Sequence, residues 1–334
     1  MEWIAGDIGG TKCRLAWVTV AADGVHNLRF EGVYASAGFG SADALLRRFM
    51  ADAQMTVRPH SMILAVPGPV HLQRVRLTNL DWILDAAELQ AGLGIADVRL
   101  VNDFEAAAAG VARLTAADLV AINARPVEPG GVQAVTGAGT GLGLAFMTPG
   151  VGGRYRSFAT EGGHTDFAPT NALQLRLLER IRRRHGHVSW ERVASGSALP
   201  DLYEFCCAEL GTRPPDTPCD GAWLSAAADA GNPVAGAALD LFVDLYGAWV
   251  GNVALLYQPR GGLYVAGGVT AHLQARLRGP RFLAAAANKG RMRGEVERTP
   301  IFLITSARLG VQGALAVREA TLHETGAAAA IAIQ

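Results

Sequence analysis

Short hydrophobic segments alternate with longer amphipathic segments along the chain, a pattern typical of α/β proteins whose sheets are covered by helices. In the first half, a glycine turn over residues 9–12 separates two strand-like segments, which predicts a β-hairpin. Ser41 is a favourable N-cap for an amphipathic helix that extends through Gln54. The strands expected in this half cover residues 3–8, 13–20, 27–35, 61–66 and 98–101.

The second half repeats the opening arrangement, because strand-like residues 131–136 and 142–147 again flank a glycine turn. We interpret this repeat as an internal duplication of one supersecondary unit. A long helical run begins at Asn232 and Pro233, an N-cap followed by proline at the first helical position. In this run another element could approach closely at Gly236, Gly247 and Gly251. Other helices are expected over 171–185 and 197–210, strands over 262–266 and 301–305, and a closing helix that packs on the N-terminal domain over 310–323.

Composition narrows the class of protein. The 334 residues are 50% hydrophobic and 18% charged, which excludes a disordered, highly charged tail. At about 150 residues per domain, the length suggests two domains. The 30 Lys and Arg residues balance the 30 Asp and Glu residues, and a net charge of zero argues against a nucleic-acid partner.

We expect neither a leader sequence nor a membrane span. Residues 1–10 lack the basic and apolar regions of a secretory signal, which predicts a cytoplasmic protein. Of two uncharged stretches, residues 130–153 are too rich in glycine and residues 245–259 too short for a span of about 20 apolar residues. No C-x-x-C pair occurs, so neither a zinc site nor a disulfide framework is expected from Cys13, Cys206, Cys207 and Cys219.

Two glycine turns have the composition of phosphate-binding loops. The first offers backbone N–H groups without obstruction from Cβ atoms, and its Asp7 can hold Mg²⁺ or its waters. An ordinary hairpin turn explains the same residues as well. The second turn lies in the repeated unit, and two such turns could hold both ends of one phosphate chain. The two turns read Gly6-Asp7-Ile8-Gly9-Gly10-Thr11-Lys12 and Gly137-Ala138-Gly139-Thr140-Gly141.

Two other nucleotide motifs are absent. A Walker A loop needs Gly-Lys followed by Ser or Thr, but the chain has only Lys12 and Lys289, and neither follows a glycine. A dinucleotide fingerprint needs Gly-x-Gly-x-x-Gly at the start of a helix, whereas Leu142 occupies the third glycine position and a strand-like run follows. Hydride transfer on a Rossmann domain is therefore disfavoured.

Asn102 and Asp103 follow an apolar strand and precede a helix-forming run, at the edge of the sheet where α/β proteins usually bind ligands. Two roles for Asp103 stay open on this evidence. It can be the N-cap of the helix, or it can be a general base that takes the proton of a substrate hydroxyl during phosphoryl transfer. The Asn102 amide can donate to and accept from a neighbouring hydroxyl.

A polar segment, Glu161-Gly162-Gly163-His164, and the acid Glu191 have the chemistry of a sugar site. Adjacent sugar hydroxyls are both donors and acceptors, so carboxylates and a histidine can bind them. Each residue alone is also explained as a structural histidine or a solvated helix charge. Asn79 is a candidate for a further hydroxyl contact.

Together and in order, these segments resemble the bacterial glucokinase family of the hexokinase and actin-like ATPase fold. The matching blocks cover nearly the whole chain: GDIGGTKCRLA (6–16), AVPGPV (65–70), LTNLDW (77–82), LVNDFEAAAAG (100–110), GAGTGLGLA (137–145), EGGHTDFAP (161–169), SWERVASGSAL (189–199), LYVAGGV (263–269) and NKGRM (288–292). The related ROK group shares DIGGTK but typically carries a cysteine-rich zinc motif after its EGGH-like block. No cysteine lies between Cys13 and Cys206, so this branch is disfavoured.

The resemblance implies a two-domain actin-like ATPase (ribonuclease H-like) fold, with mixed sheets flanked by helices and an active-site cleft between the domains. Residues 1–105 and 310–334 would form a small α/β domain and residues 106–309 a large one. The implied activity is ATP:D-glucose 6-phosphotransferase, with Mg²⁺ on the ATP phosphates and Asp103 as general base. A homodimer is also implied.

The resemblance further assigns roles to individual residues. Sugar contacts are expected from Asn102, Asp103, Glu161, His164 and Glu191. Nucleotide contacts are expected from Gly6, Asp7, Ile8, Gly9, Gly10, Thr11, Lys12, Gly137, Gly139, Thr140, Gly141, Gly267 and Gly268, with Asp7 also as the metal-associated carboxylate.

Some residues depart from the family pattern. Lys12 stands where Asn is frequent, and Ala138 replaces a usual proline, which could loosen the second turn. Ser197-Ala198 replaces a glycine-containing turn, and a left-handed backbone there would disfavour Ala198. These changes leave open a sugar-binding regulatory protein with little kinase turnover. An actin-like or chaperone-like ATPase would give no reason for the sugar-contact residues.

Overall fold

The computed structural model describes residues 1–21, 26–77, 80–150, 153–215, 217 and 219–331. The chain forms two compact units, the first from Met1–Thr115 with Ser306–Gln334 and the second from Ala116–Thr305. The sequence placed these boundaries at residues 105 and 310. The structure extends the first unit because helix α3 (Asp103–Gly110) packs against the closing helix α13 (Leu309–Ile331).

The first unit is built on a mixed sheet with strand order β3-β2-β1-β4-β7. The expected hairpin is present, since β1 and β2 pair antiparallel on either side of the first glycine turn. The remaining neighbours β4 and β7 run parallel to β1. The strands are β1 (Glu2–Ile8), β2 (Lys12–Val20), β3 (His26–Ala35), β4 (Ser61–Val66) and β7 (Asp97–Asn102), and the sequence analysis missed a small ribbon of β5 (Arg74–Arg76) and β6 (Ile83–Asp85).

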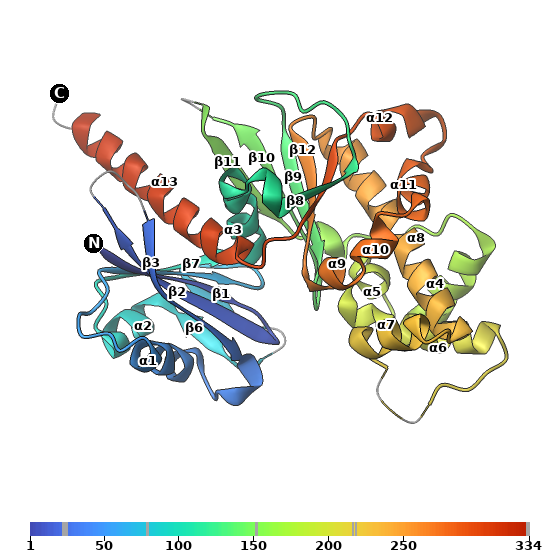
Figure 1. The fold of residues 1–334 in the computed structure, drawn as a ribbon, viewed down its shortest axis with the longest axis horizontal. Helices are drawn as coiled ribbons and strands as arrows, with labels where there is room; N and C mark the ends of the chain where they lie inside the picture. The colour runs from blue at the N-terminus through green and yellow to red at the C-terminus, as the bar shows by residue number, and fades with distance from the viewer. Residues whose placement is uncertain (22–25, 78–79, 151–152, 216, 218, 332–334) are drawn as a thin grey trace. The chain divides into compact units, whose positions relative to one another are not determined.

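Helices cover both faces of this sheet (Figure 1). Along β1, Ile4 and Ile8 pack into the cluster that contains α1 and α2, whereas Trp3 and Ala5 pack into the cluster that contains α13. This alternation follows from the two-residue period of a strand. Ser41 caps the first helix as predicted, because its side chain accepts a hydrogen bond from the third residue of the turn. The helices are α1 (Ala42–Asp52), α2 (Ala86–Leu93), α3 and α13, with short 3-10 turns over Ser36–Gly38 and Val111–Arg113.

The second unit repeats this plan, with strand order β11-β10-β9-β12-β13-β8. Its first three strands pair antiparallel, and β12 and β13 continue parallel to β9, as β4 and β7 continue from β1. The predicted duplication is therefore confirmed in the sheet topology. The strands are β8 (Leu119–Asn123), β9 (Gln133–Ala138), β10 (Leu142–Pro149), β11 (Tyr155–Thr160), β12 (Gly262–Ala266) and β13 (Ile301–Ile304), of which β8 and β11 were not anticipated.

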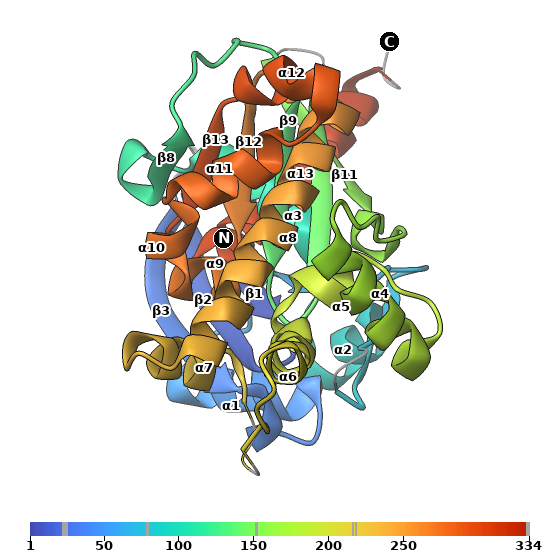
Figure 2. The same ribbon diagram turned by 90° about the vertical axis from the view of Figure 1, so that its right-hand side faces the viewer.

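Helix α8 is the central helix of the second unit (Figure 2). It begins with Asn232 as N-cap and proline at the first position, as predicted. Helix α11 approaches α8 at Gly247 and Gly251, where added Cβ atoms would lie 2.6 and 2.1 Å from backbone oxygens. At Gly236 no atom of another described element lies within 4 Å of such a Cβ. The helices of this unit are α4 (Ala172–His185), α5 (Glu191–Ala194), α6 (Leu199–Glu209), α7 (Gly221–Asp229), α8 (Pro233–Tyr257), α9 (Gly268–His272), α10 (Gln274–Leu277), α11 (Pro280–Ala287) and α12 (Arg293–Glu297), with 3-10 turns over Ala116–Asp118, Gly162–His164, Gly196–Ala198 and Gly290–Met292.

The length and composition of α8 correct one argument from the sequence. Residues 245–259 were judged too short to cross a membrane, but the helix extends from Pro233 to Tyr257. Within the described part of the chain it is the one helix long and apolar enough for a span. Of its most apolar 18 residues, 72% are buried inside the protein. Its side chains therefore form the core of the second unit.

A network of charges joins α13 to the rest of the first unit. His26 contacts Glu319 with 2.7 Å between Nε2 and Oε1, and Arg113 donates to the other oxygen of Glu319. Burial alone would raise the pKa of Glu319, but the hydrogen bonds from His26 and Arg113 outweigh it and lower the pKa to about 2. The charged carboxylate therefore stabilises the folded state.

We expect Glu319→Gln to lower the free energy of unfolding by about 2 kcal/mol at neutral pH. Since the folded pKa lies below the unfolded one, the contribution of Glu319 is complete above the unfolded pKa and disappears as the pH falls from about 4.5 toward 2. Urea unfolding at several pH values measures this. Equal acid sensitivity in wild type and variant would contradict the assignment.

Candidate functional site

The first glycine turn is a tight turn held by a residue from outside the motif. The Gly9 N–H donates to the Lys12 carbonyl at 3.1 Å, and a Cβ at position 9 would lie 2.6 Å from that oxygen. Ser36 is fully buried; its hydroxyl donates to the Gly9 carbonyl at 2.7 Å and its N–H donates to the Thr11 carbonyl at 3.0 Å. The sequence analysis missed Ser36, which the pairing of Lys12 with Ala35 brings beside the turn.

Asp7 occupies the end of β1 with surroundings suited to a functional carboxylate. Burial raises its pKa to about 6, opposed by the charge of Arg14, its cross-strand partner. The first turn of α13 packs on the carboxylate, since a Cβ on Gly310 would lie 2.4 Å from its oxygen. The described residues contain no group of three or more acidic, His or Cys side chains that could hold a metal alone. A single carboxylate fits Mg²⁺ that is bound mainly by phosphates and water.

The end of β7 settles which residue caps α3. Asn102 is the N-cap, because its Oδ1 accepts from the N–H groups of Phe104 and Glu105 at 2.9 and 3.1 Å. Its Nδ2 donates to the Gly68 carbonyl at 3.0 Å, which ties the cap to the loop after β4. Asp103 is therefore the first residue of α3 and not its cap. A half-buried carboxylate in the first turn of a helix is stabilised by the helix dipole.

Gln73 supports the same strand end and was not found from the sequence. Its side-chain amide pairs with both backbone groups of Leu100, accepting at 2.8 Å and donating at 3.3 Å. Gln73 thus completes the edge of β7 two residues before Asn102. The backbone of Gln73 is left-handed, with φ of 59°, which no pattern in the sequence indicates.

In the second unit, three backbone segments meet at the second glycine turn. The Gly139 N–H donates to the Gly141 carbonyl at 2.9 Å, and the Gly196 N–H donates to the Gly139 carbonyl at 2.8 Å. Gly267 has a φ of +100°, and a Cβ there would lie 2.4 Å from the Ala138 carbonyl oxygen. Ala198 has a φ of −79°, so the strain considered for this position does not occur.

The predicted sugar residues of the second unit also lie together. His164 Nε2 lies 3.9 Å from Glu161 Oε2 and 4.0 Å from Glu191 Oε1. The side chains of Glu161 and His164 are each 60% exposed and that of Glu191 27%, so all three are accessible to a ligand. Asn79 lies outside the described residues.

Glu191 connects the candidate sugar residues to the second glycine turn. One carboxylate oxygen faces His164, and the other accepts a hydrogen bond from the Leu142 N–H at 2.9 Å, directly after the turn. The 161–164 segment packs on the same strand, because a Cβ on Gly163 would lie 1.9 Å from the Leu142 carbonyl oxygen. The candidate sugar residues and the second glycine turn therefore lie side by side at the start of β10.

Each unit carries a glycine turn inside an antiparallel hairpin of its mixed sheet, between β1 and β2 in the first unit and between β9 and β10 in the second. This duplicated α/β architecture defines the actin-like ATPase class of fold. The same fold occurs in the crystal structure of a ROK family glucokinase from Streptomyces griseus, with a TM-score of 0.63 at 22% identity over 95% of this chain and 99% of that one.

The chain belongs to the glucokinase family, whose sequence model, described as Glucokinase, matches residues 4–321. The glucokinase of Synechocystis sp. is 38% identical over 94% of this chain and 97% of its own length. The glucokinase of Nostoc sp. is 36% identical over 93% and 97%. The crystal structure of glucokinase from an Antarctic psychrotroph has a TM-score of 0.78 at 32% identity, covering 95% of this chain and 98% of that one.

Proposed function

We propose that this chain is an ATP-dependent glucose kinase that transfers the γ-phosphate of ATP to the 6-hydroxyl of glucose. Family membership supports the reaction class. The observation that carries the proposal is the position of Glu191. One of its carboxylate oxygens faces His164, a candidate sugar residue, and the other accepts from the N–H of Leu142, directly after the second glycine turn. A sugar-binding regulator with little turnover is not favoured, because the acid that would serve as base is retained at the start of α3.

In this mechanism the residues of the chain bind, orient and deprotonate. The sugar hydroxyls are bound by four side chains, those of Asn102, Glu161, His164 and Glu191. The N–H groups of the glycine turns bind phosphate oxygens. The Asp103 carboxylate accepts the proton of the 6-hydroxyl as that oxygen attacks the γ-phosphorus and ADP leaves. Asp7 would hold Mg²⁺ or its waters, and the ion when bound neutralises phosphate charge.

The proposal requires that residues of both units act on one sugar, with the base from the first unit and most sugar contacts from the second. Exclusion of water from the bound substrates would protect the phosphoryl group, for which water otherwise competes. We further propose that the enzyme is cytoplasmic and a homodimer.

The test is phosphorylation of a hexose panel of glucose, mannose, glucosamine and fructose with ATP and Mg²⁺, measured as ADP release and as sugar 6-phosphate. We expect glucose to be the preferred acceptor and ADP release to depend on it. Equal ATP hydrolysis without any sugar would contradict the proposal in favour of an ATPase. Glucose binding without turnover would contradict it in favour of a regulatory protein.

A further inference from the structure

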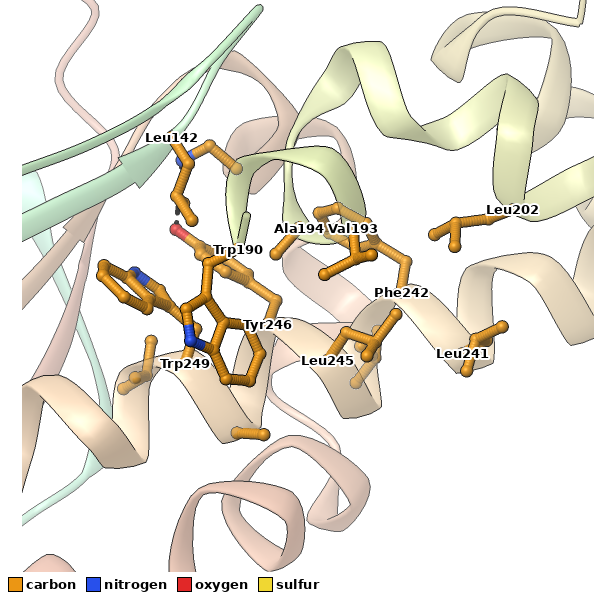
Figure 3. Packing of buried hydrophobic residues seen from close by; sticks show 14 of the residues in the cluster. Leu142, Trp190, Val193, Ala194, Leu202, Leu241, Phe242, Leu245, Tyr246 and Trp249 are labelled. Atoms are coloured by element: carbon orange, nitrogen blue, oxygen red, sulfur yellow. Dashed lines mark hydrogen bonds between the residues drawn. The ribbon is translucent and has the colours of Figure 1, made fainter. Parts of the chain in front are cut away.

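Tyr246 is a fully buried residue in the middle of α8 whose hydroxyl reaches the start of the second glycine turn. Figure 3 shows its ring rising from the helix with the hydroxyl directed toward the strand that carries Leu142. The hydroxyl oxygen accepts a hydrogen bond from the Ala138 N–H at 3.2 Å, and it lies 3.4 Å from Thr270 Oγ1. Thr270 in turn donates to the Ala266 carbonyl at 2.6 Å.

These contacts form one directed chain. The single hydroxyl proton of Thr270 is donated to Ala266, so its oxygen accepts the proton of Tyr246, whose own oxygen accepts from Ala138. Burial raises the pKa of Tyr246 to about 12, which keeps its proton in place at any physiological pH. Packing fixes the ring, with Phe242 and Phe282 at centroid distances of 5.6 and 5.9 Å.

The two ends of this chain are the last residues of β9 and β12. Ala138 directly precedes the 139–141 turn, and Ala266 directly precedes Gly267 and Gly268. Both turns are nucleotide-contact candidates. Among the described contacts, the Tyr246 hydroxyl reaches them through Ala138 and Thr270. One hydroxyl therefore restrains the backbone at the base of both turns.

The Ala138 N–H is a group that a proline at this position would not have. A buried N–H without a partner is costly, and its backbone is free to rotate away to find one. In this chain the Tyr246 hydroxyl, on another element, accepts a hydrogen bond from this N–H. The loosening that Ala138 could cause is thus opposed by Tyr246.

We propose that Tyr246 is a positioning residue for nucleotide binding, which holds the 139–141 and 267–268 turns in one arrangement and supplies the restraint that a proline at position 138 would give. This inference rests on the proposed function, because it takes both turns to bind ATP. Tyr246 itself contacts no substrate.

The experiment measures binding of a non-hydrolysable ATP analogue with Mg²⁺, and of glucose, by titration calorimetry. Tyr246→Phe keeps the ring but removes the acceptor, and we expect analogue binding about tenfold weaker, with glucose binding unchanged. Adding Ala138→Pro to Tyr246→Phe replaces the lost hydrogen bond by the fixed backbone angle of proline, and analogue affinity should return to within about twofold of wild type.

The matched control is Tyr264→Phe, a second buried tyrosine of this unit, whose hydroxyl contacts the Gly261 carbonyl at 3.4 Å, away from both turns. Its analogue affinity should equal that of wild type. Thr270→Val removes both contacts of the Thr270 hydroxyl but leaves the hydrogen bond between Ala138 and Tyr246, and it gives an independent test if Tyr246→Phe does not fold. We expect Thr270→Val to weaken analogue binding about threefold.

Unchanged analogue affinity in Tyr246→Phe, or in Thr270→Val if the first variant is unfolded, would overturn the inference. Equal weakening of glucose and analogue without recovery in the proline double variant would overturn it too, because that result describes a general structural role. A wild-type protein that binds the analogue but phosphorylates no sugar would instead contradict the proposed kinase function, so the two failures are distinguishable.

Discussion

Asp103→Asn should reduce kcat for glucose phosphorylation by about a thousandfold, within the range that general-base catalysis contributes. The amide keeps the size of the carboxylate, and its oxygen can still accept the hydrogen bond that the Phe104 N–H makes to Asp103 at 2.9 Å. It cannot accept the proton of the 6-hydroxyl. We therefore expect the glucose dissociation constant to change by no more than about threefold while turnover falls.

Glu105→Gln is the matched control for this prediction. Glu105 is the next acid of α3, and burial raises the pKa of its carboxyl. The substitution Glu105→Gln removes a charge from the same helix, but Glu105 has no part in the proposed proton transfer. The kcat of this variant should therefore stay within about twofold of wild type. Steady-state rates and glucose titrations of both variants provide the measurement. A similar loss of kcat in both, or wild-type turnover in Asp103→Asn, would remove Asp103 from the mechanism.

Local patterns were sufficient for the parts of the site that depend on neighbours in sequence. The hairpin on either side of the first turn and its repeat in the second unit follow from hydrophobic alternation and glycine, and both are present. The pattern also located the start of α3 but not its cap. Asn102 and Asp103 have similar capping preference, and the choice depends on the contact of Asn102 with Gly68, a residue distant in sequence.

The supporting residues could not be predicted because their partners are far apart along the chain. Each of them acts through hydrogen bonding to a distant residue: Ser36 to Gly9, Gln73 to Leu100 and Tyr246 to Ala138. These bonds depend on strand register or helix packing, which sequence periodicity does not specify. At Ala198 the sequence left the backbone conformation open. Strain was expected there only if the backbone were left-handed, and it is right-handed and suits alanine.

Gly313→Ala should destabilise the first unit by about 3 kcal/mol or more, because overpacking against rigid backbone is among the costly substitutions. Helices α13 and α3 approach each other at this residue, and an added Cβ would lie 1.7 Å from the Ala106 carbonyl oxygen. Backbone cannot move aside as a flexible side chain would, so α3 must shift. Since Asp103 is the first residue of α3, we expect kcat to fall together with the melting temperature.

Gly236→Ala separates this steric effect from the general effect of adding a methyl group to a helix. Gly236 lies in α8, and among the described residues no atom of another element lies within 4 Å of the added Cβ, so alanine should stabilise the protein by about 0.5–1 kcal/mol through helix propensity. Thermal unfolding by circular dichroism and steady-state rates measure both variants. If Gly313→Ala is as stable as wild type, α3 and α13 do not pack as closely as described. If it is destabilised but keeps full kcat at a temperature where it is folded, the position of α3 does not control the base.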